Sequence, residues 1–147
     1  MTSVPPSIAP FGTYVATQLN DRPIPTDVIV EYRDRYYWIL ANHVALSLMP
    51  KHRFVLSLRY HLTSFEPGVG DHPALNPGPL ECTVIRGTYR RQGVKVVLKF
   101  HIPHPIPLPR TLRVVHQDEE MTMTYESRRG GRLQRIVVQL QRYYGII

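Results

Sequence analysis

The sequence predicts an all-β protein, built as a single antiparallel up-and-down barrel of about eight strands with two proline-rich loop insertions. Apolar and polar residues alternate with a period of two along most of the chain, as they do in strands with one buried face. Short segments rich in glycine, proline or charged residues separate these runs, as the turns of hairpins do. The apolar spacing of a helix is not sustained anywhere, so long helices are not expected.

The size and composition fit one globular domain. The chain has 147 residues, which is enough for one well-buried core and too few for two. Its hydrophobic content of 43% and charged content of 20% are typical of a folded protein. We expect residues 1–11 to form an extended N-terminal arm and residues 12–147 to form the barrel domain. The N-terminus lacks the basic and apolar regions of a secretory signal, so the expected location is cytoplasmic, either free or peripheral to a membrane.

The first half of the chain contains four expected strands. Three lie near residues 12–19, 27–33 and 36–48, and residues 50–52 form a turn before the fourth. In the fourth run, over 53–62, apolar residues at even positions alternate with mostly polar residues at odd positions. This alternation places the even-numbered side chains in the interior of the barrel.

The second half alternates in the same way. Its expected strands lie near residues 83–91, 94–101, 111–116, 121–126 and 135–141. Gln92-Gly93 closes a tight turn between the first two, and Arg129-Gly130-Gly131 precedes the last. The connections therefore fit a meander of hairpins.

Two proline-rich segments interrupt the alternation. Residues 64–79 contain four prolines and three glycines, and we expect them to form a long loop or flap. Prolines occupy every second position from Pro103 to Pro109, which removes amide donors and predicts an extended, polyproline-like chain. We interpret it as a stiff connector between strands, with a docking arm for a partner as the alternative. Strand edges exposed at the two breaks would permit a homo-oligomer.

Several short motifs follow one another in a fixed order. They are Gly12-Thr13-Tyr14, the turn at 20–25, residues 44–48 leading to 54–60, Arg86-Gly87-Thr88-Tyr89, the turn at Gly93 and the strand after Gly130-Gly131. In this order the chain resembles the small lipocalin-like domains of bacteria, within the calycin group, over residues 12–142. Asp21-Arg22 departs from the pattern, since a glycine is usual in that turn. The resemblance implies a closed up-and-down barrel that can enclose an apolar cavity, and it implies no particular ligand.

Alternation gives the barrel an interior of large apolar side chains. The candidate ligand-binding residues face inward in this interpretation, and they are Trp38, Leu40, Phe54, Leu58, Tyr60, Tyr89, Phe100 and Met123. Large side chains can fill an eight-stranded barrel, so core packing is favoured over a wide cavity. Any small ligand would be a flat apolar molecule near one mouth.

The outward positions carry the more distinctive pattern. The formal net charge is +7, and the outward positions of four expected neighbouring strands hold basic charges without an acid. The candidate surface for an anionic partner consists of Arg59, Arg86, Arg90, Lys95, Lys99 and Arg113, with His61 and His101 beside them. Such a face favours an acidic protein or an anionic membrane surface. Nucleic acid is less favoured, because no aromatic residues interleave with the cations.

No motif predicts catalysis. Glu31 is a weak candidate for a general acid or base, on the condition that its side chain faces inward. Cys82 is the only cysteine, so an internal disulfide is excluded, and no base accompanies its thiol. The seven histidines are interpreted as scattered surface residues, and neither a metal nor a cofactor is expected.

Three hypotheses from different classes remain. The first is a non-enzymatic accessory or binding protein whose basic outer face docks on an acidic protein assembly or an anionic membrane surface. The second is a calycin-type carrier of a small apolar or aromatic ligand. The third is a small barrel cyclase or isomerase that holds its substrate in a reactive shape, a mechanism that leaves almost no motif. Glu31 or Tyr125 inside an open cavity would favour this third hypothesis.

Overall fold

The computed structural model describes residues 12–32, 35–65, 78–100, 111–129 and 131–144. These residues form strands without helices, so the predicted all-β class is confirmed, and no helix that could cross a membrane occurs among them. The expected N-terminal arm and most of both proline-rich insertions lie outside the described residues. The strands are β1 (Gly12–Leu19), β2 (Arg22–Pro23), β3 (Thr26–Tyr32), β4 (Arg35–Met49), β5 (Arg53–Phe65), β6 (Leu80–Gln92), β7 (Lys95–Phe100), β8 (Thr111–Gln117), β9 (Glu120–Arg129) and β10 (Arg132–Arg142).

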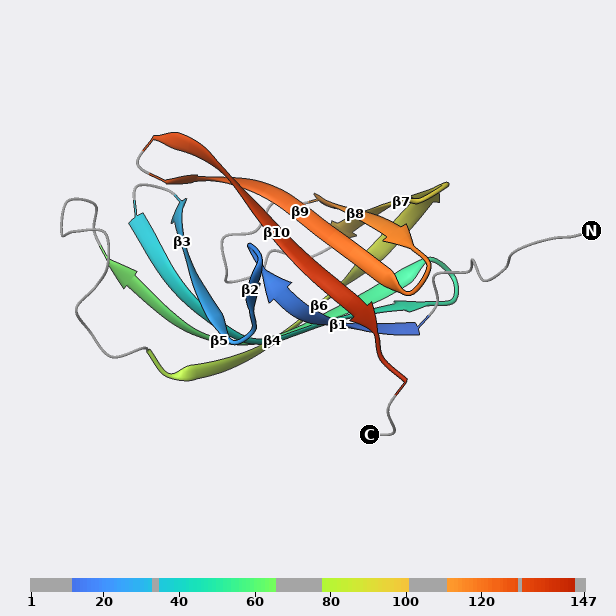
Figure 1. The fold of residues 1–147 in the computed structure, drawn as a ribbon, viewed down its shortest axis with the longest axis horizontal. Helices are drawn as coiled ribbons and strands as arrows, with labels where there is room; N and C mark the ends of the chain where they lie inside the picture. Colours follow the sequence, from blue (N-terminus) through green and yellow to red (C-terminus); the bar gives the residue numbers. More distant parts are fainter. Residues whose placement is uncertain (1–11, 33–34, 66–77, 101–110, 130, 145–147) are drawn as a thin grey trace, which may run out of the picture.

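Eight of these strands close into a barrel. Their order around it is β1-β4-β5-β6-β7-β8-β9-β10, β10 pairs again with β1, and every pair is antiparallel. Tyr14 of β1 is paired with Leu46 on one side and with Arg142 on the other, which closes the ring. In Figure 1 the β9–β10 hairpin forms one wall, and β4 and β5 form the opposite wall. The predicted up-and-down barrel is therefore confirmed.

The other two strands lie in the connection between β1 and β4. β2 pairs with β1 across a turn in which Asn20 and Asp21 have positive φ angles of 50° and 64°. Asparagine and aspartate tolerate this left-handed conformation, so the turn forms without the glycine that is usual there. β3 pairs with the first part of β4, while β1 pairs with the last part of it. The long β4 thus pairs with two different strands, β3 and β1, along the same edge.

A β-bulge in β4 reverses its side-chain alternation. The pairing with β5 shifts register between Ala41 and His43, so that the exposed Asn42 has no cross-strand partner. Before the bulge, odd-numbered residues such as Ile39 pack against the core, and after it even-numbered residues such as Leu46 do so. One extra residue therefore exchanges the two faces of the strand.

The expectation that Trp38 and Leu40 face inward is wrong. It assumes that even-numbered residues face inward along the whole of β4, whereas they do so only after the bulge. Trp38 packs instead with Ile29 and Phe65 in a small cluster separate from the barrel core. Its indole Nε1 donates a hydrogen bond to Oδ2 of Asp27 over 2.6 Å. The only tryptophan of the chain thus lies outside the barrel interior.

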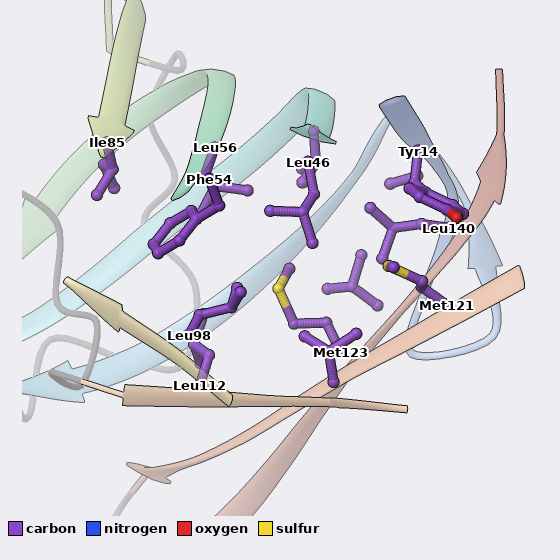
Figure 2. Packing of buried hydrophobic residues seen from close by; sticks show 14 of the residues in the cluster. Tyr14, Leu46, Phe54, Leu56, Ile85, Leu98, Leu112, Met121, Met123 and Leu140 are labelled. Atoms are coloured by element: carbon purple, nitrogen blue, oxygen red, sulfur yellow. The ribbon is translucent and has the colours of Figure 1, made fainter. Parts of the chain in front are cut away.

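The interior is a packed apolar core. Figure 2 shows side chains from opposite walls converging there, with Leu46 and Leu56 on one side and Leu98 and Met123 on the other. Tyr14 is fully buried in this core. The core fills most of the barrel, which leaves the functional surfaces to the outer wall, one small cavity and the barrel ends.

Candidate functional site

Basic residues concentrate on the outer wall over β5–β8. Five sequence-based candidates are exposed on three adjacent strands, namely Arg86 and Arg90 on β6, Lys95 and Lys99 on β7, and Arg113 on β8. Arg53 of β5, which is not among those candidates, joins them because it is exposed and paired with Thr88. Its position just before Phe54 in an alternating run is the sequence signal that places it outward. We call these six residues the basic face.

The cross-strand register keeps the cations of the basic face apart. Val97 lies between Arg90 and Arg113, and Thr88 lies between Arg53 and Lys99. Like charges therefore do not stand directly opposite one another, an arrangement that would destabilise the sheet. Within the described residues, outward positions of β5–β8 hold no acid, and no cation of the basic face forms an ion pair. Glu126 of β9 lines one surface hollow with Arg113, so the positive charge that has no carboxylate beside it is that of β6 and β7.

Arg59 and the two neighbouring histidines lie away from the basic face. Arg59 is exposed and paired with Cys82, which is four residues from Arg86 and so about 13 Å from it along β6. His61 is half-buried, and its Nδ1 lies 2.6 Å from the carbonyl oxygen of Gly78. His101 lies outside the described residues.

A small apolar cavity lies inside the barrel. Its volume is about 80 Å³, about half of the roughly 150 Å³ of an apolar cavity that binds benzene. Leu58, Tyr60 and Met123 of the candidate ligand-binding residues line it. The other candidates do not: Phe54, Tyr89 and Phe100 belong to the packed core, and Trp38 and Leu40 are on the opposite face of β4.

Tyr125 of β9 places a phenol group against this cavity. Burial raises the pKa of Tyr125, and its hydroxyl makes no hydrogen bond to a described residue. The other tyrosine of the lining differs, since the Tyr60 hydroxyl lies 2.7 Å from Oγ1 of Thr83. The cavity is therefore lined by apolar atoms, with Tyr125 among its lining residues.

The remaining catalytic and metal candidates do not gather into a site. Val30 packs in the core, so the neighbouring Glu31 points outward, where its Oε1 accepts a hydrogen bond from the amide of Gly131 over 3.3 Å. The inward-facing condition for Glu31 is thus not met. Cys82 is exposed. Across the described ranges, no group of three or more His, Cys, Asp or Glu residues is placed to hold a metal.

A larger hollow, absent from the sequence-based candidates, lies at the barrel end where β8 turns into β9 and where β10 ends. It has a volume of about 890 Å³, and its lining includes Arg91, His116, Glu119, Arg142 and Tyr144. We call it the end groove. Its volume lies within the range of about 300 to 1,000 Å³ that is usual for small-molecule sites.

The base of the end groove is a buried tyrosine–histidine pair. Nε2 of His116 lies 3.2 Å from the Tyr14 hydroxyl, and the rings meet edge to face with centroids 5.7 Å apart. Burial lowers the pKa of His116, and the positive charge of Arg91 lowers it further, so the ring is neutral at pH 7. His116 follows Leu112 and Val114 at inward positions of β8, and this is the sequence signal that would have indicated the cluster.

Comparisons of the chain with protein-family models, with curated proteins and with solved structures find no match. The basic face, the cavity and the end groove are therefore the features from which a function is inferred.

Proposed function

We propose that this protein is a non-enzymatic accessory protein that docks on an acidic protein through the basic face. One observation carries the proposal: exposed cations on β6, β7 and β8 form a group with no outward acid in the described parts of β5–β8. The summed potential of such a group attracts and orients a negatively charged partner.

The residues between the cations favour a protein as the binding partner, rather than a membrane or a nucleic acid. Val84 is 56% exposed and Val115 is 40% exposed on this outer wall, so aliphatic and basic side chains alternate across it. Valine and threonine are too short to enter a bilayer as the tryptophan, phenylalanine and leucine of membrane-binding surfaces do. The exposed Leu80 of β6 lies six residues before Arg86 and is not part of the basic face. The described outward positions of β6–β8 also carry no aromatic ring on which a base could stack.

The proposal is tested with two variants that have the same net charge and differ in where the charge is reversed. Poly-L-glutamate serves as the probe for an acidic protein surface, and its binding is followed by biolayer interferometry at rising sodium chloride. Reversal of both lysines of β7, in Lys95→Glu/Lys99→Glu, is expected to weaken binding at least tenfold. The matched control, Lys51→Glu/Arg132→Glu, changes two exposed residues outside the basic face and alters the net charge equally.

Each result of this experiment decides the proposal. Loss confined to the β7 variant, with affinity that falls as salt rises, supports docking through the basic face. Equal weakening in both variants would mean that net charge alone attracts the polymer, which would refute a local site. Tighter binding to phosphatidylserine vesicles or to duplex DNA than to poly-L-glutamate would overturn the choice of a protein partner.

A second candidate function, which we propose on the strength of Tyr125, is the holding of a small ligand inside the barrel. The lipocalin-like order of the strands supports it, and so does an apolar cavity with the buried Tyr125 in its lining. The cavity size restricts the ligand to a compact molecule with one hydrogen-bond acceptor, such as a small ketone.

Acetone, the smallest ketone, is a suitable probe for this candidate. It is expected to raise the Tm of the wild-type protein and to have little effect on Tyr125→Phe, which keeps the ring and removes only the hydroxyl. Thr122→Val, an outward change on the same strand, serves as the control and should keep the full response. An equal response of wild type and Tyr125→Phe would rule out the hydrogen bond on which the candidate depends.

A further inference from the structure

We propose that the end groove binds a small organic oxyanion, a carboxylate or phosphate ester on an apolar body. The anionic group would lie against Arg91 and Arg142, and the apolar body against Val94, Val115 and Tyr144. The arginines of this site are not part of the basic face, because Arg91 and Arg90 are neighbours on β6 whose side chains point to opposite faces of the strand. Val115, which is paired with Lys95, lies at the border between the two surfaces.

Arg142 is held in place by aromatic rings on two sides. Its guanidinium carbon lies 5.8 Å from the centroid of the Tyr14 ring and 5.5 Å from that of Tyr144. A Cβ atom on Gly12 would lie 3.0 Å from Nη2 of Arg142, so the backbone of β1 also approaches the guanidinium closely. A guanidinium fixed in this way loses little side-chain entropy on binding an anion, and its planar fork suits carboxylate and phosphate oxygens.

The walls of the groove suit an apolar body. Val94 is 47% exposed, Val115 40% and Tyr144 69%, so three apolar surfaces stand open to solvent around the arginines. The Tyr144 hydroxyl donates to the carboxylate of Glu119, with oxygen–oxygen distances of 2.6 Å, which positions the ring. An aromatic or aliphatic ligand would remove these surfaces from water.

The groove also contains acids, which surround the two arginines and His116. Asp118, Glu119 and Glu120 line the rim. Burial lowers the pKa of His116 most, and the positive charges of Arg91 and, less strongly, Arg142 lower it further, whereas the backbone and the carboxylate of Asp118 raise it. Arg91 and Arg142 therefore supply the positive charge beside His116, where an anion would be stabilised.

The proposal includes a pH dependence. His116 is faced by Tyr14 of β1, Arg91 of β6, Asp118 of the β8–β9 turn and Arg142 of β10. An anion bound beside the two arginines would offset their charge and raise the pKa of His116. By reciprocity, the affinity for the anion should rise as the pH falls through that pKa.

The experiment uses the full chain and NMR detection of the His116 ring protons. Benzoate and phenyl phosphate are the anionic probes, and benzyl alcohol is the neutral probe of similar shape. Saturable shifts of the His116 signals by the anions, stronger at pH 6 than at pH 8, are expected. Arg91→Gln should weaken anion binding at least tenfold, whereas Arg90→Gln, which removes the same charge one residue away, should not.

The outcomes separate this proposal from the docking proposal. Arg91→Gln should leave poly-L-glutamate binding unchanged, so either proposal can fail alone. Equal effects of Arg90→Gln and Arg91→Gln, or equal binding of benzyl alcohol and benzoate, would refute an oxyanion site. Absence of saturable His116 shifts in a wild-type protein that folds normally would refute it as well.

Discussion

At the scale of single residues, Gly87 is a position in the barrel wall where a side chain larger than that of glycine has no room. Gly87 of β6 is paired with Phe54 on one side and with Phe100 on the other. The two rings meet above it edge to face, with centroids 5.6 Å apart. A Cβ atom at Gly87 would lie 2.0 Å from the carbonyl oxygen of Lys99 and 2.7 Å from the Phe54 ring. Only glycine lets the three strands approach this closely.

Gly87→Ala is therefore expected to lower the free energy of unfolding by about 1 to 3 kcal/mol, the usual cost of overpacking a core. The cost should be large within this range, because the nearest atom is backbone and cannot rotate away. Urea unfolding measures it. Gly93→Ala is the contrasting variant, since a Cβ atom there meets nothing within 4 Å and the cost comes only from a φ of +62°. Stability equal to wild type in Gly87→Ala would contradict the close approach.

At the scale of elements, strands with unbroken alternation could be predicted in both position and facing. β8 reads in this way, with Leu112, Val114 and His116 inward and Arg113 exposed between them. The outward placement of the basic face followed from the same rule, and the sequence supplied most of its residues. The alternation in the sequence therefore predicts which side chains face inward wherever a strand keeps one register with its neighbour.

β4 shows why the rest could not be predicted. Its bulge at Asn42 is defined by the pairing with β5. Odd-numbered residues face the core before the bulge, and even-numbered residues face it after the bulge. A single sequence does not specify that register, because the register depends on the partner strand and the packing of both. An unbroken alternation therefore predicts Trp38 in the interior, whereas Trp38 packs in the separate cluster with Ile29 and Phe65.

At the scale of the whole molecule, closure of the barrel creates features that no local pattern contains. Tyr14 and His116 are 102 residues apart in sequence and meet only because β1 and β8 reach the same end of the ring. Arg142 of β10 and Arg91 of β6 reach the same groove. The interior meanwhile is almost full. The molecule therefore offers its outer wall and one end, rather than a wide internal cup, as surfaces for partners.

Closure also buries His116 against Tyr14, and this burial predicts how the stability of the molecule depends on pH. Burial and the nearby arginines lower the pKa of His116 in the folded state below the value near 6.5 of an unfolded chain. As the pH falls below that unfolded value, the unfolded state takes up the proton first, so stability is lost on acidification. The loss should continue until the pH reaches the folded-state pKa, with a slope of at most about 1.4 kcal/mol per pH unit.

His116→Gln removes this titration and keeps a polar group near the Tyr14 hydroxyl. Urea unfolding of both proteins between pH 7.5 and 5 should show a steeper fall in the free energy of unfolding for the wild type. The other ionisable groups are common to both proteins, so the difference between the two curves isolates His116. Parallel curves would mean that the ring binds its proton equally well in both states, and the base of the end groove would then not hold the neutral, buried imidazole inferred from its surroundings.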